Sequence, residues 1–155
     1  MAIRTIRTDS DPILRKTSKP VKVFDNKLKQ LIDDMVETMH EAEGVGLAAP
    51  QIGILKRVIV FDLYDEEGPM ALINPEVIES SGNQCEEEGC LSLPGQRGFV
   101  NRPYEIKVRF QDLQGDHYEI EGEELLARVL SHEIDHLNGI LYIDKVVNVE
   151  KEALS

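Results

Sequence analysis

Apolar residues near the N-terminus recur at intervals of three and four positions, the spacing of one face of an α-helix. Asp25 stands just before this stripe, where an aspartate can cap the first turn, and Gly44 stands just after it, where helices commonly end. The pattern therefore predicts a helix over residues 25–43. The stripe comprises Leu28, Leu31, Ile32, Met35, Met39 and Ala42.

Further along the chain the pattern changes to that of β-strands. Residues 57–63 and 70–74 are short apolar runs, each typical of a buried strand. Residues 117–122 follow residues 104–110 after the turn sequence Gln-Gly-Asp, so these two segments are predicted to pair as a hairpin. Within the first of them, alternate residues share one face, namely Tyr104, Ile106, Val108 and Phe110.

The order of these elements indicates the fold class. A second helix is expected from Glu123 to Asn138 with Gly139 as its stop, and residues 141–147 are expected to form another strand or an extended cover. A doubly wound parallel sheet would need crossover helices, and the middle of the chain shows none. We therefore predict an α+β fold with mainly antiparallel or mixed sheets packed around the second helix. No linker or repeat is visible, which predicts a single domain over residues 1–155.

Composition narrows the possible partners. The net charge of −12 argues against binding nucleic acid or anionic membrane by charge alone, so we expect neither a membrane nor a sequence-specific nucleic-acid partner. The densest apolar run, residues 58–61, is far shorter than the roughly 20 residues of a membrane span. With two cysteines and no secretory signal pattern, we expect a reduced cytoplasmic setting and no disulfide framework.

The second predicted helix carries two histidines four residues apart on its apolar face, which is formed by Leu125, Val129, His132 and His136. Two imidazoles buried one turn apart are unusual in a protein core, because their ring nitrogens need hydrogen-bond partners there. A cation shared by both rings would bind one nitrogen of each. Glu133 is rotated about 100° from His132, so it is better placed as a general base than as a ligand. A pattern this short also occurs by chance, so the alternative that this is an ordinary amphipathic helix without a metal remains open at this point. His40 and His117 lack such a context and are predicted to be surface residues.

A metal site here needs a third ligand. Downstream, Asp144, Glu150 and Glu152 offer carboxylates, the last two near the chain end. Upstream, Cys90 follows a glycine and offers a thiolate, and a Cys/His/His set leaves a fourth position open. A lone cysteine is more often a small buried hydrophobe, and Cys85 keeps that interpretation.

Residues 43–53 are rich in glycine and alanine and end in a glutamine. Because its side chains are small, this backbone can present its N–H and C=O groups to a ligand, and Gln51 adds an amide donor. Composition alone favours a simple turn between helix and strand.

Three stretches, taken in order, resemble the peptide deformylase family. That family is marked by a GφGxAAxQ segment (φ is apolar), an EGCφS segment and an HExxH helix. In this chain they stand at residues 44–51, 88–92 and 132–136. The resemblance extends from residue 11 to residue 146, which is almost the whole chain.

The resemblance implies a role for each motif residue. One divalent metal ion, usually Fe²⁺ with Zn²⁺, Ni²⁺ or Co²⁺ able to substitute, would bind to Cys90, His132 and His136. Glu133 would be the general acid/base, and the Gln51 amide and the Leu91 backbone N–H would stabilise the oxyanion. Gly46 and Gly89 would hydrogen-bond the substrate backbone. The methionine pocket would be bordered by Val45, Leu125, Val129 and Arg97.

The activity implied by the resemblance is hydrolytic removal of the formyl group from N-formyl-methionyl nascent peptides, with release of formate. One rival is a metallopeptidase that cuts internal peptide bonds and takes Asp144 or Glu150 as its third ligand. Another is a non-catalytic protein with a structural metal. The family often carries a long basic C-terminal helix that helps it dock on the ribosome. Because this chain ends in NVEKEALS, transient ribosome contact is doubtful.

Overall fold

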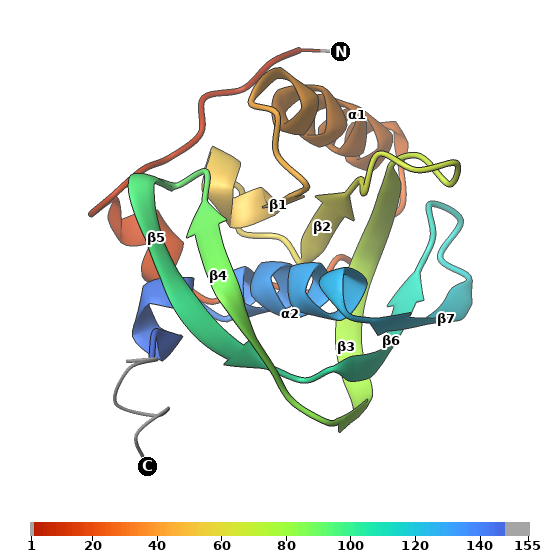
Figure 1. Ribbon diagram of the computed structural model, residues 1–155. Coiled ribbons are helices and arrows are strands. Elements are labelled where there is room, and N and C mark those ends of the chain that lie inside the picture. Colours follow the sequence, from red (N-terminus) through yellow and green to blue (C-terminus); the bar gives the residue numbers. More distant parts are fainter. Residues whose placement is uncertain (1, 148–155) are drawn as a thin grey trace, which may run out of the picture.

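The computed structural model describes residues 2–147, whose course is shown in Figure 1. Its two α-helices are α1 (Asn26–Glu41) and α2 (Leu125–Leu137). Its strands are β1 (Gly46–Ala48), β2 (Val58–Phe61), β3 (Met70–Ser81), β4 (Gln84–Cys90), β5 (Leu93–Arg102), β6 (Glu105–Gln111) and β7 (His117–Glu123). Short 3₁₀ helices are η1 (Pro12–Arg15), η2 (Ala49–Ile52) and η3 (Tyr142–Lys145).

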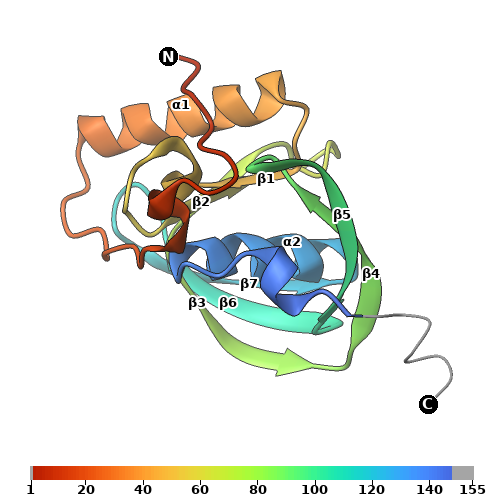
Figure 2. The ribbon, with the colours of Figure 1, turned by 90° about the vertical axis from the view of Figure 1, so that its left-hand side faces the viewer.

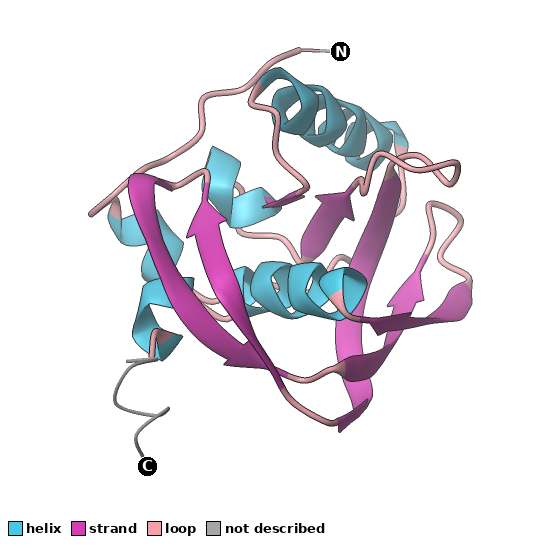
Figure 3. Ribbon diagram, in the orientation of Figure 1, coloured by secondary structure: helices cyan, strands magenta, loops and turns pink. Residues whose placement is uncertain are grey.

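The strands form two sheets, and every strand pair in them is antiparallel. Five strands lie in the order β1-β2-β3-β6-β7, and β4 pairs with β5 in a separate hairpin. Figure 2 shows α2 between this hairpin on one side and β3 and β6 on the other, with α1 above β1 and β2. Figure 3 shows that β4 and β5 curve past α2. The predicted α+β class with mainly antiparallel sheets around the second helix is confirmed.

Helix α1 follows the predicted pattern. The Asp25 side chain caps it by accepting a hydrogen bond from the Leu28 N–H at 3.0 Å. The predicted apolar stripe is buried apart from Ala42, which is half-buried, and it packs against β1, β2 and η2. The last helical residue is Glu41, slightly before the expected end.

Helix α2 begins abruptly, because Glu123 still belongs to β7. Glu124 turns the chain with a φ of 54°, and the helix starts at Leu125 rather than at Glu123. Gly139 follows its C-terminus with a φ of +73°, and a Cβ there would lie 2.4 Å from the Arg15 carbonyl oxygen. The chain therefore leaves α2 through a position that only glycine fits.

Three segments differ from the prediction. The β4–β5 hairpin was not predicted, because its strands are largely exposed and charged and lack apolar alternation. Residues 46–52 form β1 and η2, so the interpretation of this segment as a simple turn is wrong. Residues 142–145 form η3 instead of a strand or an extended cover, and a single bridge joins Val146 to Val100.

The remaining predictions have mixed outcomes. β3 continues well past residue 74, through a register shift at Asn74 with its φ of 52°. His40 and His117 are exposed as predicted, whereas Cys85 is half-buried rather than buried. Among the described residues, neither helix is long and apolar enough to cross a membrane. The single domain over residues 1–155 stays a prediction, and Met1 and residues 148–155 lie outside the described part.

Candidate metal centre and its pocket

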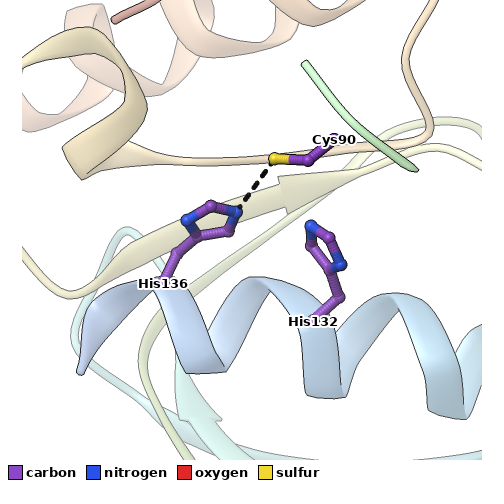
Figure 4. Close-up of side chains that lie close together, drawn as sticks. All are labelled: Cys90, His132 and His136. Atoms are coloured by element: carbon purple, nitrogen blue, oxygen red, sulfur yellow. Dashed lines mark hydrogen bonds between the residues drawn. The ribbon is translucent and has the colours of Figure 1, made fainter. Parts of the chain in front are cut away.

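Three side chains from two elements converge in the interior. Cys90 ends β4, and His132 and His136 lie one turn apart on α2. Their ligand atoms all lie within 4.8 Å of one another, and Cys90 Sγ is 3.4 Å from His136 Nε2 (Figure 4). Both histidines are buried, and His136 Nδ1 has no hydrogen-bond partner within residues 2–147. A thiolate and two imidazoles at this separation fit a divalent transition metal, whose bonds to them measure about 2.0–2.3 Å.

Asp144, the downstream carboxylate within residues 2–147, does not join this cluster. Asp144 forms an ion pair with Arg15 at 2.5 Å instead, and its pKa is lowered mainly by that hydrogen bond. Glu150 and Glu152 lie outside the described residues. The upstream cysteine is therefore the third donor that the structure places beside the two histidines.

The orientation of His132 is fixed by a buried carboxylate. Its Nδ1 lies 2.8 Å from Glu88 Oε1, and the Tyr142 ring stacks on it at a centroid distance of 6.1 Å. Burial alone would raise the pKa of Glu88, but hydrogen bonds from His132 and Arg102 lower it to about 2. Glu88 is therefore an acceptor that holds the proton of His132 on Nδ1, which leaves Nε2 free to bind a metal.

The cluster attracts positive charge. Burial alone would lower the pKa of His132, but the neighbouring Glu133 and Cys90 raise it to about 10. Burial and the charge of His132 together lower the pKa of His136. The negative charges that favour a proton on His132 would also attract a divalent cation to this cluster.

Glu133 lies in the wall of the pocket with little space around it. The residue is 4% exposed, and Oε1 has no hydrogen-bond partner in the described part of the chain. Burial raises its pKa to about 7, against the opposing charge of His132. A carboxyl group that titrates near neutrality can both accept and donate a proton, as general acid–base catalysis requires. The backbone of Gly46 abuts it, since a Cβ on Gly46 would lie 2.5 Å from Glu133 Oε2.

Gln51 is held beside the cysteine from η2. Its Oε1 accepts a hydrogen bond from the Ala48 N–H at 2.9 Å, so the amide orientation is fixed. Its Nε2 donates to Ser92 Oγ at 3.1 Å and lies 3.6 Å from Cys90 Sγ. The amide nitrogen therefore lies between Ser92 and Cys90.

A pocket of about 530 Å³ opens onto this cluster. At its rim, Val45 is 41% and Leu125 52% exposed, whereas Val129 is buried. Arg97 forms an ion pair with Glu87 at the mouth. All the predicted site residues line the pocket except His136. The lining residues among them are Val45, Gly46, Gln51, Gly89, Cys90, Leu91, Arg97, Leu125, Val129, His132 and Glu133.

Comparison with known proteins identifies the family. The model of the polypeptide deformylase family matches residues 3–152. The chain belongs to the peptide deformylase family. The peptide deformylase of Alkaliphilus metalliredigens is 61% identical over 95% of this chain and 99% of its own length. That of Agathobacter rectalis is 58% identical over 94% of this chain and 91% of its own length.

Solved deformylase structures share the fold. The crystal structure of the Thermotoga maritima enzyme superposes with a TM-score of 0.92 at 46% identity, and the alignment covers 96% of this chain and all of that one. As a peptide deformylase, the protein is a metal-dependent hydrolase that removes the formyl group from the N-terminal formylmethionine of nascent polypeptides. The rival interpretation as a peptidase of internal bonds has no support.

Two charged residues of this deformylase pocket were missed by the sequence analysis. Glu88 stands in a run of glutamates that resembles a solvated surface, yet it is 5% exposed and accepts hydrogen bonds from two arginines. Arg128 is 6% exposed and lines the pocket between Leu125 and His132. Its spacing of three and four from those residues could have placed it on the same helix face.

Proposed function

We propose that Cys90, His132 and His136 hold one divalent metal ion, which is Fe²⁺ in the cell and can be replaced by Zn²⁺, Ni²⁺ or Co²⁺. When bound, such an ion supplies Lewis acidity for the hydrolysis of an amide. The convergence of these three donors beside Glu133, at one end of a pocket, is the observation that carries the proposal.

The substrate in this proposal is a peptide that begins with formylmethionine. β1 is an edge strand of its sheet, so Gly46 can offer backbone groups to an extended peptide, and Gly89 lines the same pocket. The methionine side chain would lie against Val45, Leu125 and Val129, with Arg97 at the mouth. The Acinetobacter baumannii deformylase, 38% identical with a TM-score of 0.90 over 94% of this chain and all of that one, has been crystallised with Met-Ala-Ser bound, which supports a peptide with N-terminal methionine.

Glu133 would move the proton during the reaction. Its carboxylate takes a proton from the attacking water and delivers it to the leaving amine. The Gln51 amide and the Leu91 N–H donate hydrogen bonds to the formyl oxygen as negative charge develops there. Removal of one such hydrogen-bond donor typically lowers kcat by a factor of about 10²–10³.

We infer that the protein acts in the cytoplasm, on nascent chains as they leave the ribosome. Any contact with the ribosome in this proposal is transient.

The test is formate release by protein purified without air and loaded with Fe²⁺ or Ni²⁺. Formyl-Met-Ala-Ser should yield formate, and Met-Ala-Ser should stay uncleaved. Glu133→Ala should keep one metal per chain yet lose nearly all turnover, while Glu119→Gln on the exposed face of β7 should match the wild type. If metal binds but no formate appears, the substrate assignment is wrong, and retained activity in Glu133→Ala would remove it from the proton-transfer role.

A further inference from the structure

A tyrosine close to the pocket adopts a backbone conformation that suits glycine. Tyr64 lies in the loop between β2 and β3 with a φ of 58°, in the left-handed region that a bulky residue rarely occupies. Such a conformation costs stability and persists only where the surrounding contacts hold it. The residue is 58% exposed, so burial of its ring does not explain a tyrosine at this position. The explanation has to come from what its polar groups contact.

The hydroxyl of Tyr64 reaches the wall of the pocket. It donates a hydrogen bond of 2.7 Å to the carbonyl oxygen of Gly44. Gly44 lines the pocket together with the next two residues, Val45 and Gly46. The tyrosine therefore holds the chain directly before Val45, which borders the proposed methionine pocket.

The loop that carries Tyr64 is itself anchored through Asp62. The buried Asp62 carboxylate accepts a hydrogen bond from the Tyr64 N–H at 2.7 Å and lies 2.8 Å from His40 Nε2 on α1. The Asp62 N–H donates to the Val45 carbonyl oxygen at 2.9 Å. Two successive carbonyl groups of the pocket wall, those of Gly44 and Val45, are therefore held by one loop that is fixed to α1.

Val45 stands at the exposed rim of the pocket, outside the regular pairing of β1. It is 41% exposed, and β1 begins only at Gly46. If a ligand has to order such a segment, the ordering weakens its binding. A contact that fixes the segment in advance therefore strengthens binding without touching the ligand.

We propose that Tyr64 is a positioning residue for the methionine pocket of this deformylase. Its hydroxyl holds the Gly44 carbonyl group, and with it the Val45 side chain, in the place that receives the substrate side chain. The inference rests on the proposed function, because it takes the formylmethionine side chain to lie against Val45. Tyr64 does not itself line the pocket, so it affects substrate binding and not the chemical step.

The first test uses metal-loaded Tyr64→Phe, which removes the hydroxyl alone. One hydrogen bond is worth about three- to tenfold in an equilibrium constant, so the KM for formyl-Met-Ala-Ser should rise by that factor. kcat should stay within about twofold, because the lost contact serves ground state and transition state alike. Tyr118→Phe removes an exposed hydroxyl from β7, outside the pocket, and should leave KM unchanged. An unchanged KM in Tyr64→Phe, or a fall in kcat alone, would overturn the proposal.

A second substrate separates positioning of the pocket wall from a general loss of structure. Formyl-Ala-Ala-Ser carries only a methyl group in place of the methionine side chain and gains little from the wall at Val45. The ratio of formyl-Met to formyl-Ala kcat/KM should therefore fall by about three- to tenfold in Tyr64→Phe. An equal loss with both peptides would overturn the assignment to this wall. If the wild type releases no formate from formyl-Met-Ala-Ser, the proposed function fails instead.

Tyr64→Gly provides an independent check, because backbone strain and positioning respond to it in opposite directions. Glycine adopts a φ of 58° without strain, so this variant should unfold at a urea concentration no lower than Tyr64→Phe does. Its KM for formyl-Met-Ala-Ser should nevertheless rise at least as far. A wild-type KM would overturn the proposal. A lower unfolding midpoint together with a raised KM would also count against it, since Tyr64 would then act through the stability of the fold.

Discussion

The contact between Gly46 and Glu133 makes a sharp prediction for Gly46→Ala. Gly46 lies in β1 and has no left-handed φ, so alanine fits its backbone conformation. The new Cβ, however, would lie 2.5 Å from Glu133 Oε2 and 3.0 Å from its Cδ and Cγ. The atoms nearest to the new Cβ all belong to Glu133, so the substitution acts on this carboxylate and not on Cys90, His132 or His136.

The size of the effect follows from these distances. Ordinary contact with a Cβ begins at 3.4 Å, so the carboxylate must move away by about 0.9 Å, the difference between 3.4 and 2.5 Å. Glu133 is buried, so its carboxylate has little room for this move and is displaced from its present position. A misplacement of about 1 Å in a reacting group can cost about 10²-fold in rate. We expect kcat of Gly46→Ala to fall by about that factor.

The assay is formate release from formyl-Met-Ala-Ser at saturating substrate, with the metal content of each preparation measured alongside. Gly44→Ala is the matched comparison, because its Cβ would meet Leu91 Cδ1 at 2.7 Å, which is the end of a side chain that can rotate. It should lose less than tenfold. A wild-type kcat in Gly46→Ala, with full metal content, would refute the proposed role of Glu133 or its close approach to β1.

Three further predictions concern the metal and the N-terminal segment. Cys90→Ser should lose metal at least tenfold more readily on dialysis against a chelator, because a hydroxyl is a poorer ligand than a thiolate, and unchanged retention would point to another third ligand. Activity should decay in air faster with Fe²⁺ than with Ni²⁺, since iron beside a thiolate promotes oxidation of both, and equal lifetimes would argue against iron. Burial alone would raise the pKa of Asp34, but hydrogen bonds from Arg4, Ala2 and Gln30 lower it below 3.8. The ionised Asp34 therefore stabilises the folded protein above pH 3.8, and this contribution is lost as the pH falls below that value. Urea unfolding should show Asp34→Asn less stable by about 1–3 kcal/mol at pH 7, a deficit that shrinks below pH 3.8, and a constant deficit down to pH 2 would contradict the ion-pair explanation.

The helix periodicity and the three motifs were enough to predict both helices and the cluster of Cys90, His132 and His136. The spacing of His132 and His136 fixes their common helix face without knowledge of the rest of the fold. Cys90 could not be placed beside them in this way, because 42 positions separate it from His132 and their approach depends on how β4 packs against α2. The family resemblance supplied that link, and the structure brings the three side chains together.

The residues that escaped the sequence analysis are those whose burial is decided by long-range packing. Glu88 belongs to a glutamate run in which its neighbours Glu86 and Glu87 are exposed, and only the register of β4 turns it inwards. Its burial then requires cations, which Arg102 from β5 and Arg128 from α2 supply. A buried carboxylate would be costly without them, so the three residues form one unit whose members come from three elements. Local pattern cannot reveal such a unit, yet this unit fixes the orientation of His132 through its contact with Glu88.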